Sequence, residues 1–351
     1  MSHIKNIEIK NFKSIRHAKI EDCRRVNVFI GYPNVGKSNI LEAMSLMSYL
    51  QRNYMVEFKK NFRYKELIDL FSDGDREKDA EIFTDDYVFS LRFMDKDWVD
   101  FSIADKVSYV ENFNSSKSHI FKTDKINKEG KVGRVEVDNS YDDNKFVVRK
   151  YQFKEDTING VSPKNSNLKV LSSPYGTNLS EVIRYNAGLR KECGELFSTY
   201  NLKLIFDESN NIIVQKQLDE FSAFQFSLQQ VADTLQRLIF HKAAIATNEN
   251  TVLLFEEPEA HMFPPYIGKF TADVMFDENN NQYFITTHSP FVLNDFMEDL
   301  DKEDYAIYAI GYKKETGETV VRRITDDEIN EIYQYGIDLF FNLENFLKDA
   351  V

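Results

Sequence analysis

Residues 31–38 constrain this chain more than any other segment, because their sequence GYPNVGKS fits the pattern G-x-x-x-x-G-K-[ST]. A short apolar run, residues 26–30, precedes them, and a helical pattern over residues 38–50 follows. Gly31 and Gly36 allow the backbone to curl so that consecutive N–H groups face an anion, and the start of the helix adds its positive dipole end. The sequence therefore predicts a phosphate-binding loop between a strand and a helix.

The side chains of this loop have separate expected roles. Lys37 is expected to reach the β- and γ-phosphates of a nucleotide, and the Ser38 hydroxyl is expected to take a place on Mg²⁺. An ordinary glycine-containing turn is the alternative, but it would not require the whole motif between a strand and a helix. The expected ATP-binding set is Gly31, Asn34, Gly36, Lys37, Ser38 and Asn39.

Two further strand-like runs end in polar tips. Residues 251–255 are apolar and lead into EEPEAH at 256–261, while residues 283–287 lead into His288. Open α/β sheets place their ligand chemistry at the carboxyl ends of strands. We therefore expect Glu256, Glu257 and His288 to meet the phosphate loop in one crevice.

These segments, together with IKNIEIKNFKSI at residues 4–15, resemble the ATP-binding-cassette (ABC) type of ATPase head. Such heads occur in RecF, in structural-maintenance-of-chromosomes (SMC) proteins and in overcoming-lysogenization-defect (OLD) nucleases. The resemblance implies an α/β P-loop NTPase fold with a mixed sheet. It also implies that Glu256 joins Ser38 in holding Mg²⁺, that Glu257 polarises the attacking water, and that His288 senses the γ-phosphate. Catalysis would then rest on Lys37, Glu257 and His288.

Two positions depart from that family pattern. Glu256 stands where the family usually has Asp, and its extra methylene predicts slow turnover. The family's signature motif, which touches the ATP of a partner subunit, falls at Ala232, Asp233 and Thr234, where Ser and Gly are common at the first and last positions. Ser227 offers a second register, although it also begins a capping box. We expect a composite site across a dimer, with the first register favoured.

Composition excludes several classes of protein. With 351 residues and 42% hydrophobic content, the chain can bury a large core in one elaborated domain or two lobes. No apolar run approaches the ~20 residues needed to cross a bilayer, and no signal-peptide layout opens the chain, so we expect a cytoplasmic protein without a membrane partner. Cys23 and Cys193 have a spacing that implies neither a disulfide framework nor a zinc site. Four other histidines fit structural roles: His3, His17, His119 and His241.

We expect an ATPase core from residues 1–75 and 225–351, interrupted by an insertion over residues 76–224. The insertion is expected to hold a β-rich stretch, then one helix over residues 178–200 and a hairpin. The expected C-terminal elements are strands at residues 305–310 and 319–324, a helix capped by Thr325, and a last helix from Gly336. The tail is too short for the toprim nuclease domain of OLD nucleases.

The resemblance leads to three functional hypotheses. The first is a stand-alone OLD/RecF-like ATPase that forms a homodimer or higher homo-oligomer on ATP and controls a separate effector, a nuclease or toxin in bacterial anti-phage defence. The second is a RecF-like DNA-binding repair ATPase. The third is a nucleotide-binding scaffold with little hydrolysis, which Glu256 and the weak signature motivate.

DNA contact is a further expectation at two basic stretches. The net charge of −13 opposes binding of nucleic acid over the whole surface, but a local basic patch can still bind phosphate. Solvated faces are the alternative at both places. The candidates are residues 59–65 and the series Lys122, Lys125, Lys128, Lys131 and Arg134.

Overall fold

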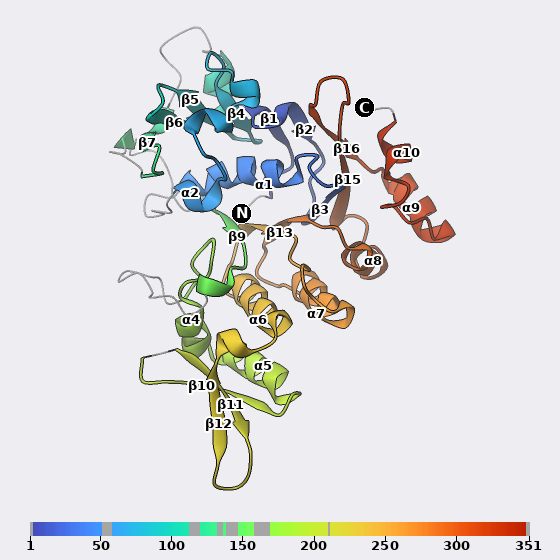
Figure 1. The fold of residues 1–351 in the computed structure, drawn as a ribbon. Helices are drawn as coiled ribbons and strands as arrows, with labels where there is room; N and C mark the ends of the chain where they lie inside the picture. Colours follow the sequence, from blue (N-terminus) through green and yellow to red (C-terminus); the bar gives the residue numbers. More distant parts are fainter. Residues whose placement is uncertain are drawn as a thin grey trace.

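The computed structural model describes residues 3–50, 58–111, 120–131, 136–137, 147–157, 169–209 and 211–348. Its described part holds a seven-stranded and a six-stranded sheet with helix α1 (Lys37–Ser45) between them (Figure 1). A group of helices covers the outer face of the six-stranded sheet. A three-stranded sheet projects from the helical side.

The six-stranded sheet positions the predicted site. Its strand order is β16-β15-β3-β14-β13-β9, and every neighbouring pair is parallel except β15 with the edge strand β16. Because parallel strands end at the same edge, Gly31, Glu256 and Thr286 lie along one edge of the sheet. The strands are β3 (Val26–Gly31), β9 (Val147–Tyr151), β13 (Thr251–Glu256), β14 (Gln282–Thr286), β15 (Tyr305–Tyr312) and β16 (Thr319–Arg323).

The other large sheet is antiparallel, with the order β2-β1-β4-β5-β6-β7-β8. Its N-terminal strands are continued by strands from the segment that the sequence analysis set apart as an insertion, and that segment also supplies β9 to the six-stranded sheet. The polar stretches around these short strands gave no sequence signal that the strands pair with the core. The strands are β1 (Ile7–Phe12), β2 (Ile15–Ile20), β4 (Ala80–Phe83), β5 (Tyr87–Phe93), β6 (Trp98–Asp105), β7 (Ile120–Asn127) and β8 (Glu136–Val137).

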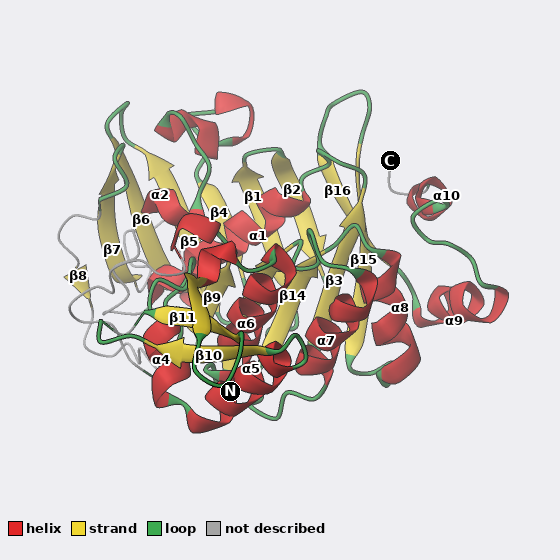
Figure 2. Cartoon of the chain, turned by 60° about the horizontal axis from the view of Figure 1, so that its bottom comes forward, coloured by secondary structure: helices red, strands yellow, loops and turns green. Residues whose placement is uncertain are grey.

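Both faces of the six-stranded sheet are buried, which explains its near-continuous apolar strands. Residues such as Phe29 and Phe284 pack with α1 and the antiparallel sheet, while Val28 and Phe255 face the outer helices. Figure 2 shows these helices lying across the strands. They are α4 (Leu179–Tyr185), α5 (Ala187–Ser198), α6 (Asp233–Ala246), α7 (Pro264–Met275) and α8 (Pro290–Asp299).

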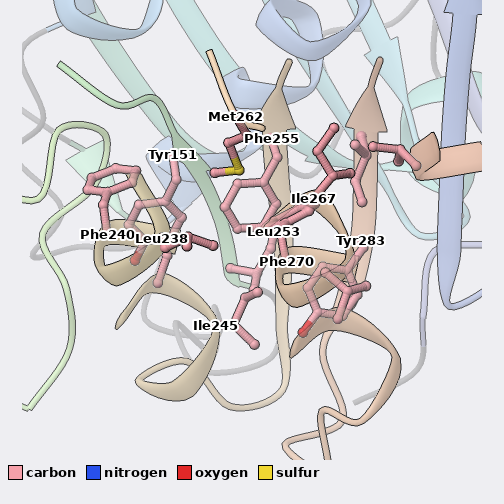
Figure 3. Close-up of a cluster of buried hydrophobic side chains, with 14 of the residues drawn as sticks. Tyr151, Leu238, Phe240, Ile245, Leu253, Phe255, Met262, Ile267, Phe270 and Tyr283 are labelled. Atoms are coloured by element: carbon pink, nitrogen blue, oxygen red, sulfur yellow. The ribbon is translucent and has the colours of Figure 1, made fainter. Parts of the chain in front are cut away.

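Aromatic and aliphatic side chains pack together in the core around β13 (Figure 3). Phe255 of β13 stacks with Tyr151 of β9 at 6.0 Å and with Tyr283 of β14 at 6.5 Å between ring centroids. Phe270 of α7 meets Phe255 edge-on at 5.6 Å. This packing fixes β9, β13 and β14 relative to one another.

Several expected elements differ in their bounds. The helix after the phosphate loop ends at Ser45 and continues as a 3₁₀ turn to Leu50. The helix expected over residues 178–200 is two helices, because Asn186 leaves the helical conformation and its side chain caps α5 by accepting from the Leu189 N–H at 3.0 Å. The hairpin is confirmed as β10 (Leu202–Phe206) and β11 (Ile212–Gln217), with a third strand, β12 (Ala223–Ser227), beside it.

The C-terminal elements are largely as expected. Thr325 and Glu328 form the predicted capping box at the start of α9 (Asp326–Tyr335). The prediction of a final helix from Gly336 was wrong, since Gly336 adopts the left-handed conformation that ends α9, and α10 spans Leu343–Leu347. Within the described ranges, no helix combines the length and the apolar character that a bilayer crossing requires.

Candidate nucleotide site

The phosphate loop turns where only glycine fits. Gly36 has φ of 104° and caps α1, and a Cβ built on it would lie 2.4 Å from the Thr319 hydroxyl oxygen. A Cβ on Gly31 would lie 2.5 Å from the Ile310 carbonyl oxygen. β15 and β16 therefore press against the loop and hold its backbone in the curled form that exposes N–H groups to an anion.

Lys37 is buried beneath this loop. Its Nζ donates hydrogen bonds to the carbonyl oxygens of Gly31 at 2.8 Å and Tyr32 at 2.9 Å. Burial lowers the pKa of Lys37 to about 8, against the opposing pull of the carboxylates of Glu257, Glu256 and Glu259. A buried ammonium group is stabilised when an anion pairs with it, so Lys37 is suited to bind phosphate.

Glu256 ends β13 beside the start of α1. Burial favours its neutral form, but Lys150, a hydrogen bond from Ser38 and Arg63 together hold the pKa of Glu256 below its ordinary value. Lys150 Nζ lies 3.1 Å from Glu256 Oε2, and Arg63 Nη2 lies 3.3 Å from Glu256 Oε1. Mg²⁺ prefers oxygen ligands such as hydroxyl groups and ionised carboxylates. Ser38 and Glu256, which are neighbours in space, therefore fit this ion.

Glu257 and His288 meet at the carboxyl ends of β13 and β14. Glu257 Oε1 lies 3.3 Å from His288 Nε2, and both side chains are partly exposed. Glu257 adopts a positive φ of 46°, while its N–H donates to the Thr286 carbonyl at 3.0 Å. Burial and the nearby Lys37 lower the pKa of His288, and Glu257 opposes them. Lys37, Glu257 and His288 therefore share one electrostatic environment.

Glu259 is a site residue to which the sequence analysis assigned no role. Its Oε1 accepts from the Thr287 hydroxyl at 2.7 Å and from the His288 backbone N–H at 2.9 Å. Burial raises the pKa of this carboxyl group despite those bonds. Its position in the EEPEAH segment marked Glu259 as close to the site. Only the fold shows that Glu259 links the loop after β13 to the loop after β14.

Lys150 and Arg63 were also not predicted for the site. Arg63 belongs to one of the basic stretches considered for DNA, but its Nε donates to Glu42 and its guanidinium approaches Glu256. Lys150 lies on β9, next to β13 in the sheet. Gln152 directly follows β9 at the same edge. Sequence reasoning found no partner strand for β9, so these residues could not be placed.

The other predicted residues have different surroundings. Asn34 is exposed with φ of 65°, and the Asn39 amide donates to Ser14 Oγ at 2.8 Å, which ties α1 to the first strand pair. At the proposed signature, Ala232 precedes α6, Asp233 pairs with Arg237, and the Thr234 hydroxyl donates to the His261 carbonyl at 3.1 Å. His119 and Arg134 lie outside the described residues.

The chain matches a protein-family model described as "AAA domain, putative AbiEii toxin, Type IV TA system", over residues 26–294. That range contains the phosphate loop and both polar strand tips. The chain belongs to this AAA_21 family. ATP hydrolysis is the general activity of its P-loop ATPase class, whose members bind ATP with Mg²⁺.

Curated relatives of this AAA_21 protein match over shorter parts. An uncharacterized protein from Methanocaldococcus jannaschii, MJECL10, is 27% identical over 121 residues, which is 32% of this chain and 51% of that protein. The DNA replication and repair protein RecF of Thermoanaerobacter sp. strain X514 is 39% identical over 46 residues, 13% of each chain. An "ATP/GTP phosphatase" of Helicobacter pylori is 44% identical over 41 residues, 12% of this chain and 11% of that protein. The match thus spans about half of the first relative and a small fraction of the others.

Solved SMC heads share the fold. An Smc head with an extended coiled coil, from a Pyrococcus furiosus complex, has a TM-score of 0.55 at 12% identity and covers 96% of this chain and 100% of its own. An Smc head bound to the C-winged helix domain of ScpA has a TM-score of 0.54 at 14% identity, with 94% and 100% covered. The predicted fold class, an ABC-type P-loop ATPase head with a mixed sheet, is confirmed. The OLD subgroup stays a prediction.

Proposed function

We propose that this AAA_21 protein binds Mg·ATP at the edge of the six-stranded sheet and hydrolyses it slowly. The observation that carries the proposal is the meeting of Lys37, Glu256, Glu257 and His288, which come from three strand ends far apart in the sequence. A phosphate cradle, a carboxylate for a metal and a second carboxylate beside a histidine are the parts that phosphoryl transfer needs.

Each of these residues has a definite task in the proposed reaction. The loop N–H groups and Lys37 bind the phosphates, and Ser38 with Glu256 would hold Mg²⁺, which supplies charge neutralisation when bound. Glu257 orients the attacking water and accepts its proton, since its carboxylate is partly exposed at the mouth of the site. His288 lies beside Glu257 and would donate to the γ-phosphate.

We further propose that the nucleotide state controls assembly and a separate effector, as in the OLD/RecF-like group. The start of α6, with Ala232, Asp233 and Thr234, would contact the ATP of a second copy, so ATP would favour a homodimer. The family description names a putative toxin and a type IV toxin–antitoxin system, which supports a link to a toxin. The role in anti-phage defence with a separate nuclease or toxin as effector is inferred from the resemblance to the OLD group. Native mass spectrometry of the protein expressed with its neighbouring genes, with and without ATP, tests for that effector.

The variant Glu257→Gln tests the hydrolytic role. Removing the general base should reduce turnover by at least about 100-fold while ATP stays bound, so the variant should accumulate as a closed dimer. Phosphate release and light scattering measure these two effects. Glu278→Gln, at an exposed position after α7, is the matched control and should behave as wild type. Wild-type turnover at background would favour the scaffold hypothesis, and full activity in Glu257→Gln would exclude this residue as the base.

DNA binding is a second candidate function, which one observation favours. The two basic stretches lie side by side in the structure, because the Phe58 N–H donates to the Gly130 carbonyl at 3.1 Å at the start of α2 (Phe58–Asn61). This contact brings exposed Lys59 near exposed Lys131. A patch of this kind could contact a phosphate backbone as RecF-like repair ATPases are expected to do.

A further inference from the structure

Lys150 is a charged residue on a strand of the buried sheet. Its side chain is 4% exposed, and it lies on the same face of β9 as Val148, which packs in the core between the two large sheets. Removing an ammonium group from water is costly unless a carboxylate compensates it. The compensation comes from Glu256 Oε2 at 3.1 Å, one strand away. The structure thus joins a buried cation to the carboxylate that is proposed to hold the metal.

Each oxygen of Glu256 has a protein cation beside it. Lys150 is at Oε2 and Arg63 is at Oε1, 3.3 Å away. Ser38, the other proposed metal ligand, contributes to the lowered pKa of this carboxyl group. A divalent cation placed between Ser38 and Glu256 would meet the electrostatic repulsion of these two positive groups.

The two cations differ in their ability to leave. The Arg63 side chain is 61% exposed, and the fully buried Glu42 holds it independently by accepting from its Nε. Arg63 can therefore release Glu256 and keep a partner. Lys150 is buried, and among the residues that the structure describes Glu256 is the carboxylate that pairs with it. Lys150 can give up Glu256 only when another anion arrives.

We propose that Lys150 is a positioning residue that holds the Glu256 carboxylate in place of the metal, so that the chain accepts a divalent cation only together with nucleotide phosphates. The phosphates supply the anion that Lys150 needs when Glu256 turns to the metal. This inference rests on the proposed Mg·ATP site. It makes Mg²⁺ entry and ATP entry a single coupled event, and it excludes a metal-loaded, nucleotide-free state.

Binding of Mn²⁺ to the nucleotide-free protein tests this coupling, with the free-ion electron paramagnetic resonance signal as readout. Wild type should leave Mn²⁺ free. Lys150→Met, which keeps the length of the side chain and removes its charge, should bind Mn²⁺ at least about tenfold more tightly. Lys150→Arg should resemble wild type, and adding Glu256→Gln to Lys150→Met should abolish the gain. Arg63→Met is the matched control. It removes a cation from the same carboxylate but leaves Lys150 in place, so it should bind Mn²⁺ no more tightly than wild type.

The outcomes separate this inference from the function on which it rests. Equal Mn²⁺ affinity in Lys150→Met and wild type, or a gain that survives Glu256→Gln, would overturn the role of Lys150 while leaving Mg·ATP binding by wild type intact. If Lys150→Met did not fold, Lys150→Gln would take its place with the same expected gain, and tight Mn²⁺ binding by wild type without nucleotide would contradict the proposal whichever variant is used. Circular dichroism reports folding for every variant.

Discussion

Glu259 illustrates how a single buried carboxyl group organises the proposed site. It accepts hydrogen bonds from the Thr287 hydroxyl and from the His288 N–H, so the position of the histidine depends on a residue 29 positions earlier. Glu257, two residues before Glu259, meets the same histidine through its side chain. The loops after β13 and β14 therefore form one unit, and in the proposed reaction their relative placement would set the geometry of the attacking water.

Removal of this anchor should affect catalysis more than nucleotide binding. In Glu259→Ala, His288 loses its backbone partner and is free to shift, and we expect turnover to fall by about 10- to 100-fold, with ATP affinity changed much less. Steady-state phosphate release and a binding titration separate the two quantities. Glu278→Gln again serves as the surface control. An unchanged rate in Glu259→Ala would show that the hydrogen bonds to Glu259 do not position His288.

The elements that carry the site were mostly predictable because their signals are local. The phosphate loop lies in one segment, and β13 and β14 are apolar runs that end in polar tips, so their parallel pairing follows from general rules of α/β sheets. β9 escaped prediction as a core strand because its five residues include Arg149 and Lys150. The role of Lys150 depends on its place next to β13, which no local pattern reveals.

Helix α6 contains a histidine that should set part of the acid stability. His241 is fully buried against Phe240, Phe255 and Phe270, and burial foremost, then Arg237, lowers its pKa to about 3. The unfolded chain therefore binds this proton first as the pH falls below about 6.5. Its contribution is complete above that pH and is lost toward pH 3, at about 1.4 kcal/mol per pH unit.

The pH dependence of His241→Phe tests that assignment. Between pH 6.5 and 5, the free energy of unfolding should fall less steeply with falling pH in the variant than in wild type. The difference in slope should approach that of one bound proton, about 1.4 kcal/mol per pH unit. Urea titrations at several pH values supply the slopes. Phe291→Leu, which replaces an exposed ring on α8 and removes no ionisable group, should retain the wild-type slope. Parallel curves for His241→Phe and wild type would contradict a neutral, buried His241.

At the scale of the whole molecule, the antiparallel sheet and the six-stranded sheet enclose α1, and the outer helices cover the opposite face. The sequence predicted the ABC-type head but not this division, because β4–β8 extend the N-terminal strand pair through contacts between residues far apart in the chain. The same arrangement brings Lys59 and Lys131 together on the outside of the antiparallel lobe.

DNA binding through this patch would have a characteristic dependence on salt. If Lys59 and Lys131 each contact a phosphate, replacing both by Gln should reduce the slope of log affinity against log salt by about 1.8 for duplex DNA. Fluorescence anisotropy at several salt concentrations measures the slope. Lys313→Gln with Lys314→Gln, two exposed lysines in the turn after β15, forms the control. Absence of salt-dependent DNA binding by wild type would argue against the RecF-like repair function.

The central claim is that three distant strand ends form one Mg·ATP site, and equilibrium titration of a fluorescent ATP analogue with Mg²⁺ tests it most directly. Wild type should bind the analogue. Lys37→Ala should bind it about 100-fold more weakly, a loss of about 2.7 kcal/mol, because the buried ammonium that meets the phosphates is gone. Equal affinity in Lys37→Ala and wild type would contradict the site.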